Sequence, residues 1–127
     1  MKTLLTGFSG ITLALLASLS YAKTPTDWVK FHEDDSAVVY YSPKSIGKTK
    51  ETFGVNVLAN SKRGAGSLLD FWIVSCAEKE YASVAVLAFS GNYARGFFQG
   101  SVGQAGTEFM SMSQSTPSWP VYKAVCK

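Results

Sequence analysis

The first 22 residues decide how much of this chain folds and in which compartment it folds. Lys2 gives a short, positively charged start, and an uncharged, mostly apolar stretch follows over residues 4–19. The tripeptide Ser20-Tyr21-Ala22 follows this stretch, and its first and third residues are small. A charged start, a short apolar core and a small-x-small exit are what signal peptidase reads. We therefore expect a cleavable signal peptide over residues 1–22 and a single domain over residues 23–127.

A membrane anchor is the alternative interpretation of the same segment. Crossing ~30 Å of hydrocarbon takes roughly 20 apolar residues, whereas this stretch is shorter and contains Gly7, Ser9 and Gly10. Neither cysteine of the chain lies near the expected cleavage point, so lipid attachment through an amino-terminal cysteine is not expected. We expect export to the periplasm or the medium without a lipoprotein anchor, with association with the cell surface left open.

Export also sets the expectation for the two cysteines, Cys76 and Cys126. An even pair in an oxidising compartment is more often bonded than free. A crosslink that closes a loop of about 50 residues would contribute roughly 4 kcal/mol to stability. The alternative is that the two cysteines are buried free thiols. A zinc site is not expected, because two ligands alone do not hold the metal. The chain left after cleavage, of about 105 residues, has the common size of one domain.

The charge balance argues against nucleic acid as a partner. Removing Lys2 from the 12 basic residues leaves 11, against 9 acidic residues, so the net charge of the processed chain is about +2. Nucleic-acid binding calls for a dense basic face. This composition does not supply one.

Short runs with a period of two dominate the rest of the chain and predict strands, because alternate side chains of a strand face opposite sides of a sheet. Many are rich in β-branched and aromatic residues, as in Ala37-Val38-Val39-Tyr40-Tyr41. In the third run Phe53, Val55 and Val57 share one face. The predicted strands cover residues 27–31, 37–41, 51–60, 67–76, 81–89 and 93–99, with a weaker final one over 107–113.

The end of the chain predicts a short helix. Ser118 fits its N-cap, and Pro120 is tolerated in the first turn, where its missing N–H costs little. Tyr122 and Cys126 are four residues apart and so share a face, which would dock on the sheet and bring Cys126 to Cys76. The predicted fold class is α+β, a mostly antiparallel β-sheet of about six strands with a short C-terminal helix tied to it by a disulfide.

The run 67–76 is apolar on both faces and is predicted to be a central strand covered on both sides. Asp70 interrupts it and is the acid whose setting would perturb its pKa most, which makes it a candidate for acid–base chemistry. An edge position or a nearby arginine would explain Asp70 without any function.

The sequence contains no further set of residues that points to catalysis. The single histidine, His32, begins an acidic run that ends at Asp35, and a solvated hairpin turn explains this run better than a metal cluster. No serine of the processed chain lies in a Gly-x-Ser-x-Gly elbow. We therefore expect no enzyme activity, no cofactor and no metal.

Cationic and aromatic side chains offer candidates for binding. If the loops around the third predicted strand lie at one end of the sheet, their cations form a basic patch able to meet an anionic partner surface. The plain alternative is that lysines in loops are simply soluble. These cations are Lys44, Lys48, Lys50, Lys62 and Arg63. Near Arg95, Phe97 and Phe98 would point to opposite faces of a strand, which leaves one of them exposed unless the helix covers it.

Several landmarks along the processed chain share the order found in one known family. They are Trp28, the run Tyr40-Tyr41-Ser42-Pro43-Lys44-Ser45-Ile46, Val55 and Val57, Cys76, Pro117-Ser118-Trp119, and Val125-Cys126. The chain resembles the surface-adhesin protein E-like family of small Gram-negative exported proteins. The resemblance implies an antiparallel sheet with a disulfide-tied carboxy-terminal helix. It also implies an adhesin-like activity, since the founding member is an outer-membrane lipoprotein that captures host extracellular-matrix and plasma proteins.

Two departures limit what the resemblance carries over. This chain lacks the cysteine for a lipid anchor, and the shared residues build the fold, so no binding residue is transferred. The functional hypothesis is an exported, non-enzymatic, adhesin-like binding protein. The alternative is a periplasmic accessory or inhibitor-type domain that binds another envelope protein.

Overall fold

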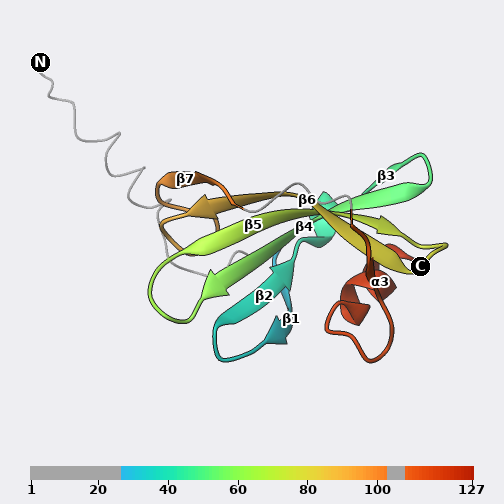
Figure 1. Cartoon of the computed structure of the whole chain (residues 1–127), viewed down its shortest axis with the longest axis horizontal. Helices are drawn as coiled ribbons and strands as arrows, with labels where there is room; N and C mark the ends of the chain where they lie inside the picture. Colours follow the sequence, from blue (N-terminus) through green and yellow to red (C-terminus); the bar gives the residue numbers. More distant parts are fainter. Residues whose placement is uncertain (1–26, 103–107) are drawn as a thin grey trace, which may run out of the picture.

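Residues 27–102 and 108–127 are described by the computed structural model, and within them eight strands form one antiparallel sheet (Figure 1). The predicted signal peptide lies outside the described residues, as does the first residue of the strand predicted over 107–113. The strands are β1 (Val29–Glu33), β2 (Ala37–Tyr41), β3 (Gly47–Thr49), β4 (Thr52–Ser61), β5 (Ser67–Ser75), β6 (Glu80–Phe89), β7 (Phe98–Ser101) and β8 (Met110–Ser111). A 3-10 turn, η1 (Pro43–Ser45), and a terminal helix, α3 (Trp119–Val125), complete the described elements.

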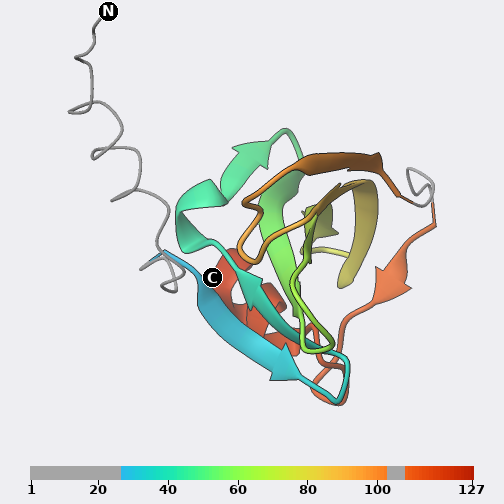
Figure 2. The same cartoon turned by 90° about the vertical axis from the view of Figure 1, so that its left-hand side faces the viewer.

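The sheet follows the chain almost in order, which confirms the predicted antiparallel α+β class. Six strands run β1-β2-β4-β5-β6-β7, while β3 pairs with β4 and β8 with β6. Figure 2 shows the sheet curving into a half-barrel, with α3 on its inner side. The curvature brings the Phe31 ring of β1 to 6.2 Å, centroid to centroid, from the Trp72 ring of β5, although two strands separate them in the sheet.

The first hairpin forms as predicted, with its turn closed by a local side chain. Oδ1 of Asp34 accepts hydrogen bonds from the backbone N–H groups of Ser36 and Ala37, at 2.8 and 3.0 Å. Aspartate commonly closes turns in this way. The pairing of β1 with β2 shifts register between Lys30 and His32, which is the signature of a bulge and increases the local twist.

The core lies between the inner face of the sheet and α3. The predicted apolar face of β4 is confirmed, with Val55 and Val57 buried and Phe53 packed against them. Fully buried side chains in such a layer each contribute roughly 1.5–3 kcal/mol to folding. The remaining buried members of this cluster come from β5, the segment after β8, and α3: Trp72, Val74, Met112, Val121 and Val125.

A disulfide between Cys76 and Cys126 ties α3 to the end of β5, as predicted, with a Cα–Cα distance of 5.6 Å. Tyr122 lies on the same face of the helix and donates from its hydroxyl to the Cys76 carbonyl oxygen. Pro120 occupies the first turn as expected. Ser118 holds the N-cap position but makes no capping hydrogen bond; its Oγ lies 3.0 Å from Oγ1 of Thr116 instead.

The prediction of a strand over residues 93–99 is wrong at its start. Tyr93 and Ala94 have positive φ angles of 59° and 56°, so the chain forms a loop there and β7 begins only at Phe98. The loop is held by buried polar side chains of the sheet. Oδ1 of Asn60 accepts from the Tyr93 N–H at 2.8 Å, and Oγ of Ser67 accepts from the Ala94 N–H at 2.9 Å. These contacts stabilise a backbone conformation that side-chain-bearing residues seldom adopt.

Candidate binding site

The five predicted binding cations do not form one patch, because they lie at two ends of β4. Lys44 lies in η1, Lys48 in β3 and Lys50 in the turn before β4, whereas Lys62 and Arg63 follow its last residue. Ten residues of strand span about 30 Å. The cations therefore form two groups that no single small epitope would contact together.

The second group is partly engaged within the chain. Nζ of Lys62 lies 2.6 Å from a carboxylate oxygen of Glu33, and Nζ of Lys30 lies 2.9 Å from the other oxygen. The hydrogen bonds from Lys62 and Lys30, followed by their charges, lower the pKa of Glu33 to about 2. Lys62 thus has an internal partner, and partner binding by these cations remains a prediction.

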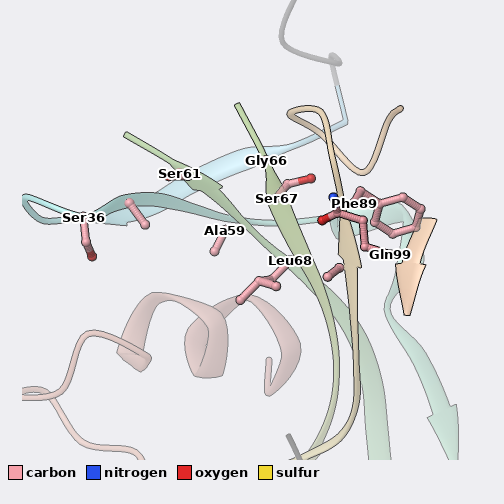
Figure 3. A pocket seen from close by; sticks show the side chains of 10 residues that line it. Ser36, Ala59, Ser61, Gly66, Ser67, Leu68, Phe89 and Gln99 are labelled. Atoms are coloured by element: carbon pink, nitrogen blue, oxygen red, sulfur yellow. The ribbon is translucent and has the colours of Figure 1, made fainter. Parts of the chain in front are cut away.

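An apolar cavity of about 330 Å³ opens at one end of the inner face (Figure 3). Its lining includes Ala37, Ala59, Leu68 and Ala88, together with the polar Ser36 and Ser61. Figure 3 shows the Leu68 and Ala59 side chains pointing to the side of the sheet on which the helix lies. Leu68 is 41% exposed, so this leucine presents an open apolar surface.

A second cavity, of about 300 Å³, opens between the first hairpin and the segment before α3. The Trp72 and Tyr81 rings form one wall, stacked at a centroid distance of 3.9 Å and an angle of 20°. The remaining lining combines apolar and polar residues: Phe31, Val39, Met110 and Pro117, with His32, Ser111, Thr116 and Ser118. Cavities of about 300–1,000 Å³ with such linings are the usual setting of ligand binding.

The two cavities lie on one face of the sheet. Leu68 of the first and Trp72 of the second are four residues apart on β5, and Ala37 and Val39 are two apart on β2. Side chains at even separations on a strand share a face. The pairing of β5 with β4 is regular from Ser67 to Val74, so this alternation is unbroken along β5. We call this part of the inner face, from Leu68 to Trp72, the concave groove.

Asp70 lies midway along the concave groove, between the two cavities. It is not at an edge, because β5 has β4 on one side and β6 on the other, and among the described residues no lysine or arginine pairs with it. Both structural explanations expected for this aspartate are therefore wrong. Its hydrogen-bond partner is Ser83, whose hydroxyl donates to Oδ1. Burial, followed by the charge of Asp70, raises the pKa of Tyr81.

The groove was missed by sequence reasoning, although its signal was present. The run from 67 to 76 is apolar on both faces, but the face carrying Leu69, Phe71 and Ile73 is only half-buried, and the predicted complete cover of β5 on that side is absent from the described structure. A sequence cannot show that β1 curls over the opposite face of β5, which carries Leu68 and Trp72. Nor can it show that cavities remain on that face.

Trp72 has a second unusual property. The residue is 7% exposed, and its Nε1–H group is buried without a hydrogen-bond acceptor among the described residues. A buried donor without a partner costs roughly 1–3 kcal/mol. The wall of the second cavity therefore contains a polar group that the described fold leaves unsatisfied.

The remaining candidates from the sequence lie elsewhere. Nε2 of His32 lies 3.5 Å from a carboxylate oxygen of Asp34 in its own hairpin. The described part of the chain holds no group of three or more histidine, cysteine, aspartate or glutamate side chains placed for a metal ion. Phe97 and Phe98 are both exposed, at 82% and 59%; Phe97 precedes β7, and Phe98 is its first residue. None of the helices in the described residues is long and apolar enough to cross a bilayer.

A curved antiparallel sheet, with a disulfide-linked helix and two cavities on its inner face, defines the class of domain. The chain belongs to the surface-adhesin protein E family, whose model matches residues 28–127. This confirms the resemblance found in the sequence and makes the chain an adhesin-like protein. No curated protein matches the sequence.

Solved structures of Haemophilus influenzae protein E share the fold. The selenomethionine form is 14% identical, with a TM-score of 0.68 over 84% of this chain and 90% of that chain. Protein E from non-typeable Haemophilus influenzae is 12% identical, with a TM-score of 0.64 over 84% of this chain and 79% of that chain. At these identities the likeness shows a common architecture and carries no binding residue across.

Proposed function

We propose that this chain is an exported, non-enzymatic, adhesin-like protein that binds host extracellular-matrix or plasma proteins. The observation that carries the proposal is its membership of the surface-adhesin protein E family over residues 28–127. The two open apolar cavities on the concave groove support a binding role, because apolar concavities are where partners and ligands are most often held.

The arrangement of the reactive side chains supports the non-enzymatic part of the proposal. Both cysteines are joined in the disulfide, so neither is a thiolate nucleophile. His32 lies beside Asp34 at a hairpin turn, and no described serine hydroxyl hydrogen-bonds to it.

The test is binding of the protein, purified after export, to immobilised collagen, laminin, fibronectin and fibrinogen, with serum albumin as control. We expect saturable binding to at least one of the four and none to albumin. Absence of binding to all four, with the disulfide intact, would contradict the proposal.

We also propose that the cations Lys44, Lys48, Lys50, Lys62 and Arg63 assist partner binding. Their division between two ends of β4 allows a direct comparison of the two groups. A triple variant, with alanine in place of Lys44, Lys48 and Lys50, is compared in the same assay with a double variant. The double variant has alanine in place of Lys62 and Arg63. If neither triple nor double variant weakens binding, the cations have no such role.

For the location, we propose export directed by residues 1–22 to the periplasm or the medium, with association with the cell surface left open, and without a lipid anchor, since the disulfide leaves neither thiol for acylation. Protease accessibility on whole cells would show surface association and support the adhesin-like function. Recovery of protected protein in osmotic-shock fluid would instead support the alternative, a periplasmic accessory or inhibitor-type domain with an envelope partner.

A further inference from the structure

We propose that the concave groove binds an extended peptide segment of the partner, with a lysine or arginine between two apolar side chains. The inference rests on the proposed function, since it gives the chemistry of the segment through which a protein partner is held. Three adjoining features of one strand carry it: the cavity at Leu68, the carboxylate of Asp70 and the cavity at Trp72.

The spacing of these features matches that of a peptide. Leu68, Asp70 and Trp72 follow one another at intervals of two residues on β5, which are about 6.6 Å each. An extended peptide places its first, third and fifth side chains at the same interval on one face. A segment lying along β5 therefore directs one apolar side chain into each cavity and its central side chain toward Asp70.

The charge of Asp70 selects the central side chain. Its cross-strand neighbours on β4 and β6 are Val57 and Val86, so the side chains directly opposite the carboxylate on both strands are apolar. A half-buried carboxylate is costly unless it is paired, and Ser83 supplies only a neutral donor. A lysine or arginine of the partner would supply the missing charge, and the apolar surroundings strengthen that attraction relative to water.

Two acids of the first hairpin, which borders the second cavity, already have partners. Glu33 pairs with Lys30 and Lys62, and Asp34 accepts hydrogen bonds from its own turn. Asp70, by contrast, forms no ion pair with a described residue and is available to an external cation. The aromatic walls formed by Trp72 and Tyr81 favour an aromatic or large aliphatic side chain at the neighbouring position.

The experiment is selection of displayed random heptapeptides on the protein purified after export. We expect enrichment of an apolar residue, a cation and a second apolar residue at alternate positions. In selected peptides, replacing the central lysine by glutamate is expected to weaken binding at least tenfold, measured by fluorescence anisotropy. This arm needs no protein variant and stands even if variants fold poorly.

Asp70→Asn tests the receiving side of the contact. Loss of a hydrogen bond to a charged group is expected to weaken binding of the lysine peptides about ten- to a hundredfold. Binding of the same peptides with a central glutamine is expected to stay unchanged. The matched control is Glu78→Gln, which removes the same charge from an exposed turn outside the groove and is expected to change nothing.

Several results would overturn the proposal: no enriched peptides, enriched peptides without a central cation, or equal effects of Asp70→Asn and Glu78→Gln. Binding to the matrix-protein panel is measured on the same preparations. Retained panel binding without the peptide pattern would refute the groove alone, whereas loss of both in the unaltered protein would refute the proposed function.

Discussion

The hydroxyl of Tyr122 donates a hydrogen bond of 3.2 Å to the carbonyl oxygen of Cys76. The sulfur of Cys76 is bonded to that of Cys126, which lies about one helical turn after Tyr122. α3 has seven residues, and helices of this length are not stable in isolation. Its position is therefore set by contacts with the sheet. The covalent bond, the hydrogen bond and the buried Val121 and Val125 all fix the same short element.

Tyr122→Phe is expected to lower the free energy of unfolding by about 0.5–1.5 kcal/mol, because it removes one hydrogen bond and leaves the ring stacked on Trp119. Urea unfolding of the two proteins measures the difference. Tyr41→Phe is the matched control, since the Tyr41 hydroxyl makes no hydrogen bond with a described residue. Equal losses in the two variants would show that the Tyr122 contact contributes nothing specific.

Replacing both Cys76 and Cys126 by alanine is expected to cost roughly 4 kcal/mol of stability, since the bond closes a loop with a sequence separation of 50. Loss of the crosslink widens the unfolded ensemble. Urea unfolding, and thermal unfolding with and without reductant, measure the effect. A double variant as stable as the oxidised protein would mean that packing of Val121 and Val125 alone holds α3.

Acidification is expected to weaken the first hairpin. Contacts with Lys62 and Lys30 lower the pKa of Glu33 to about 2, and hydrogen bonds from Ser36 and Ala37 lower that of Asp34 to about 2. A carboxyl group with a lowered folded pKa stabilises the fold above its unfolded pKa of about 4. That contribution is lost as the pH falls from about 4.5 toward 2.

Urea midpoints measured across this pH range test the effect with the variant Glu33→Gln/Asp34→Asn. The variant is expected to lose less stability on acidification than the unaltered protein. The contribution of Glu33 to this loss of stability is expected to be smaller at high salt, because its ion pairs are exposed. Glu78→Gln, an acid without an ion pair among the described residues, is expected to behave as the unaltered protein. Parallel curves for all three proteins would contradict the assignment.

Asn60→Ala is expected to destabilise the protein by about 1–3 kcal/mol. Asn60 is 5% exposed, and its removal leaves the Tyr93 N–H without its acceptor. Faster hydrogen exchange at Tyr93 and Ala94 is the local readout. The matched control is Asn56→Ala, four residues earlier on the same face of β4, whose side chain makes no hydrogen bond with a described residue. If both substitutions cost the same, the loop does not depend on Asn60.

The alternation of apolar residues along the sequence and the oxidising compartment were sufficient to predict most of the fold. Alternation predicted β4 and β5 to within one residue at their ends, and the export signal turned Cys76 and Cys126 into a correctly predicted bond. These features depend on neighbours in the sequence or on the chemistry of the compartment. They need no knowledge of how distant segments meet.

The features that were missed depend on distant contacts. Tyr93 adopts a left-handed backbone conformation because Asn60, 33 residues away, binds its N–H. The segment Gly47–Thr49, expected as a loop, pairs with β4 and places Lys48 on a strand. The same limitation applies to the concave groove, since the cavity at Trp72 exists only where Phe31 arches across the curved sheet.

The disulfide has a consequence for resistance to proteases. Cys76 and Cys126 enclose β6, β7, β8 and α3, together with the exposed Phe97. A single cut anywhere between the two cysteines divides the backbone but releases no fragment, because both pieces stay covalently joined. An exported chain cleaved once between the two cysteines would migrate as an intact species on a non-reducing gel. Its two pieces would separate only after reduction. The bond thus protects the integrity of the molecule after its backbone has been nicked.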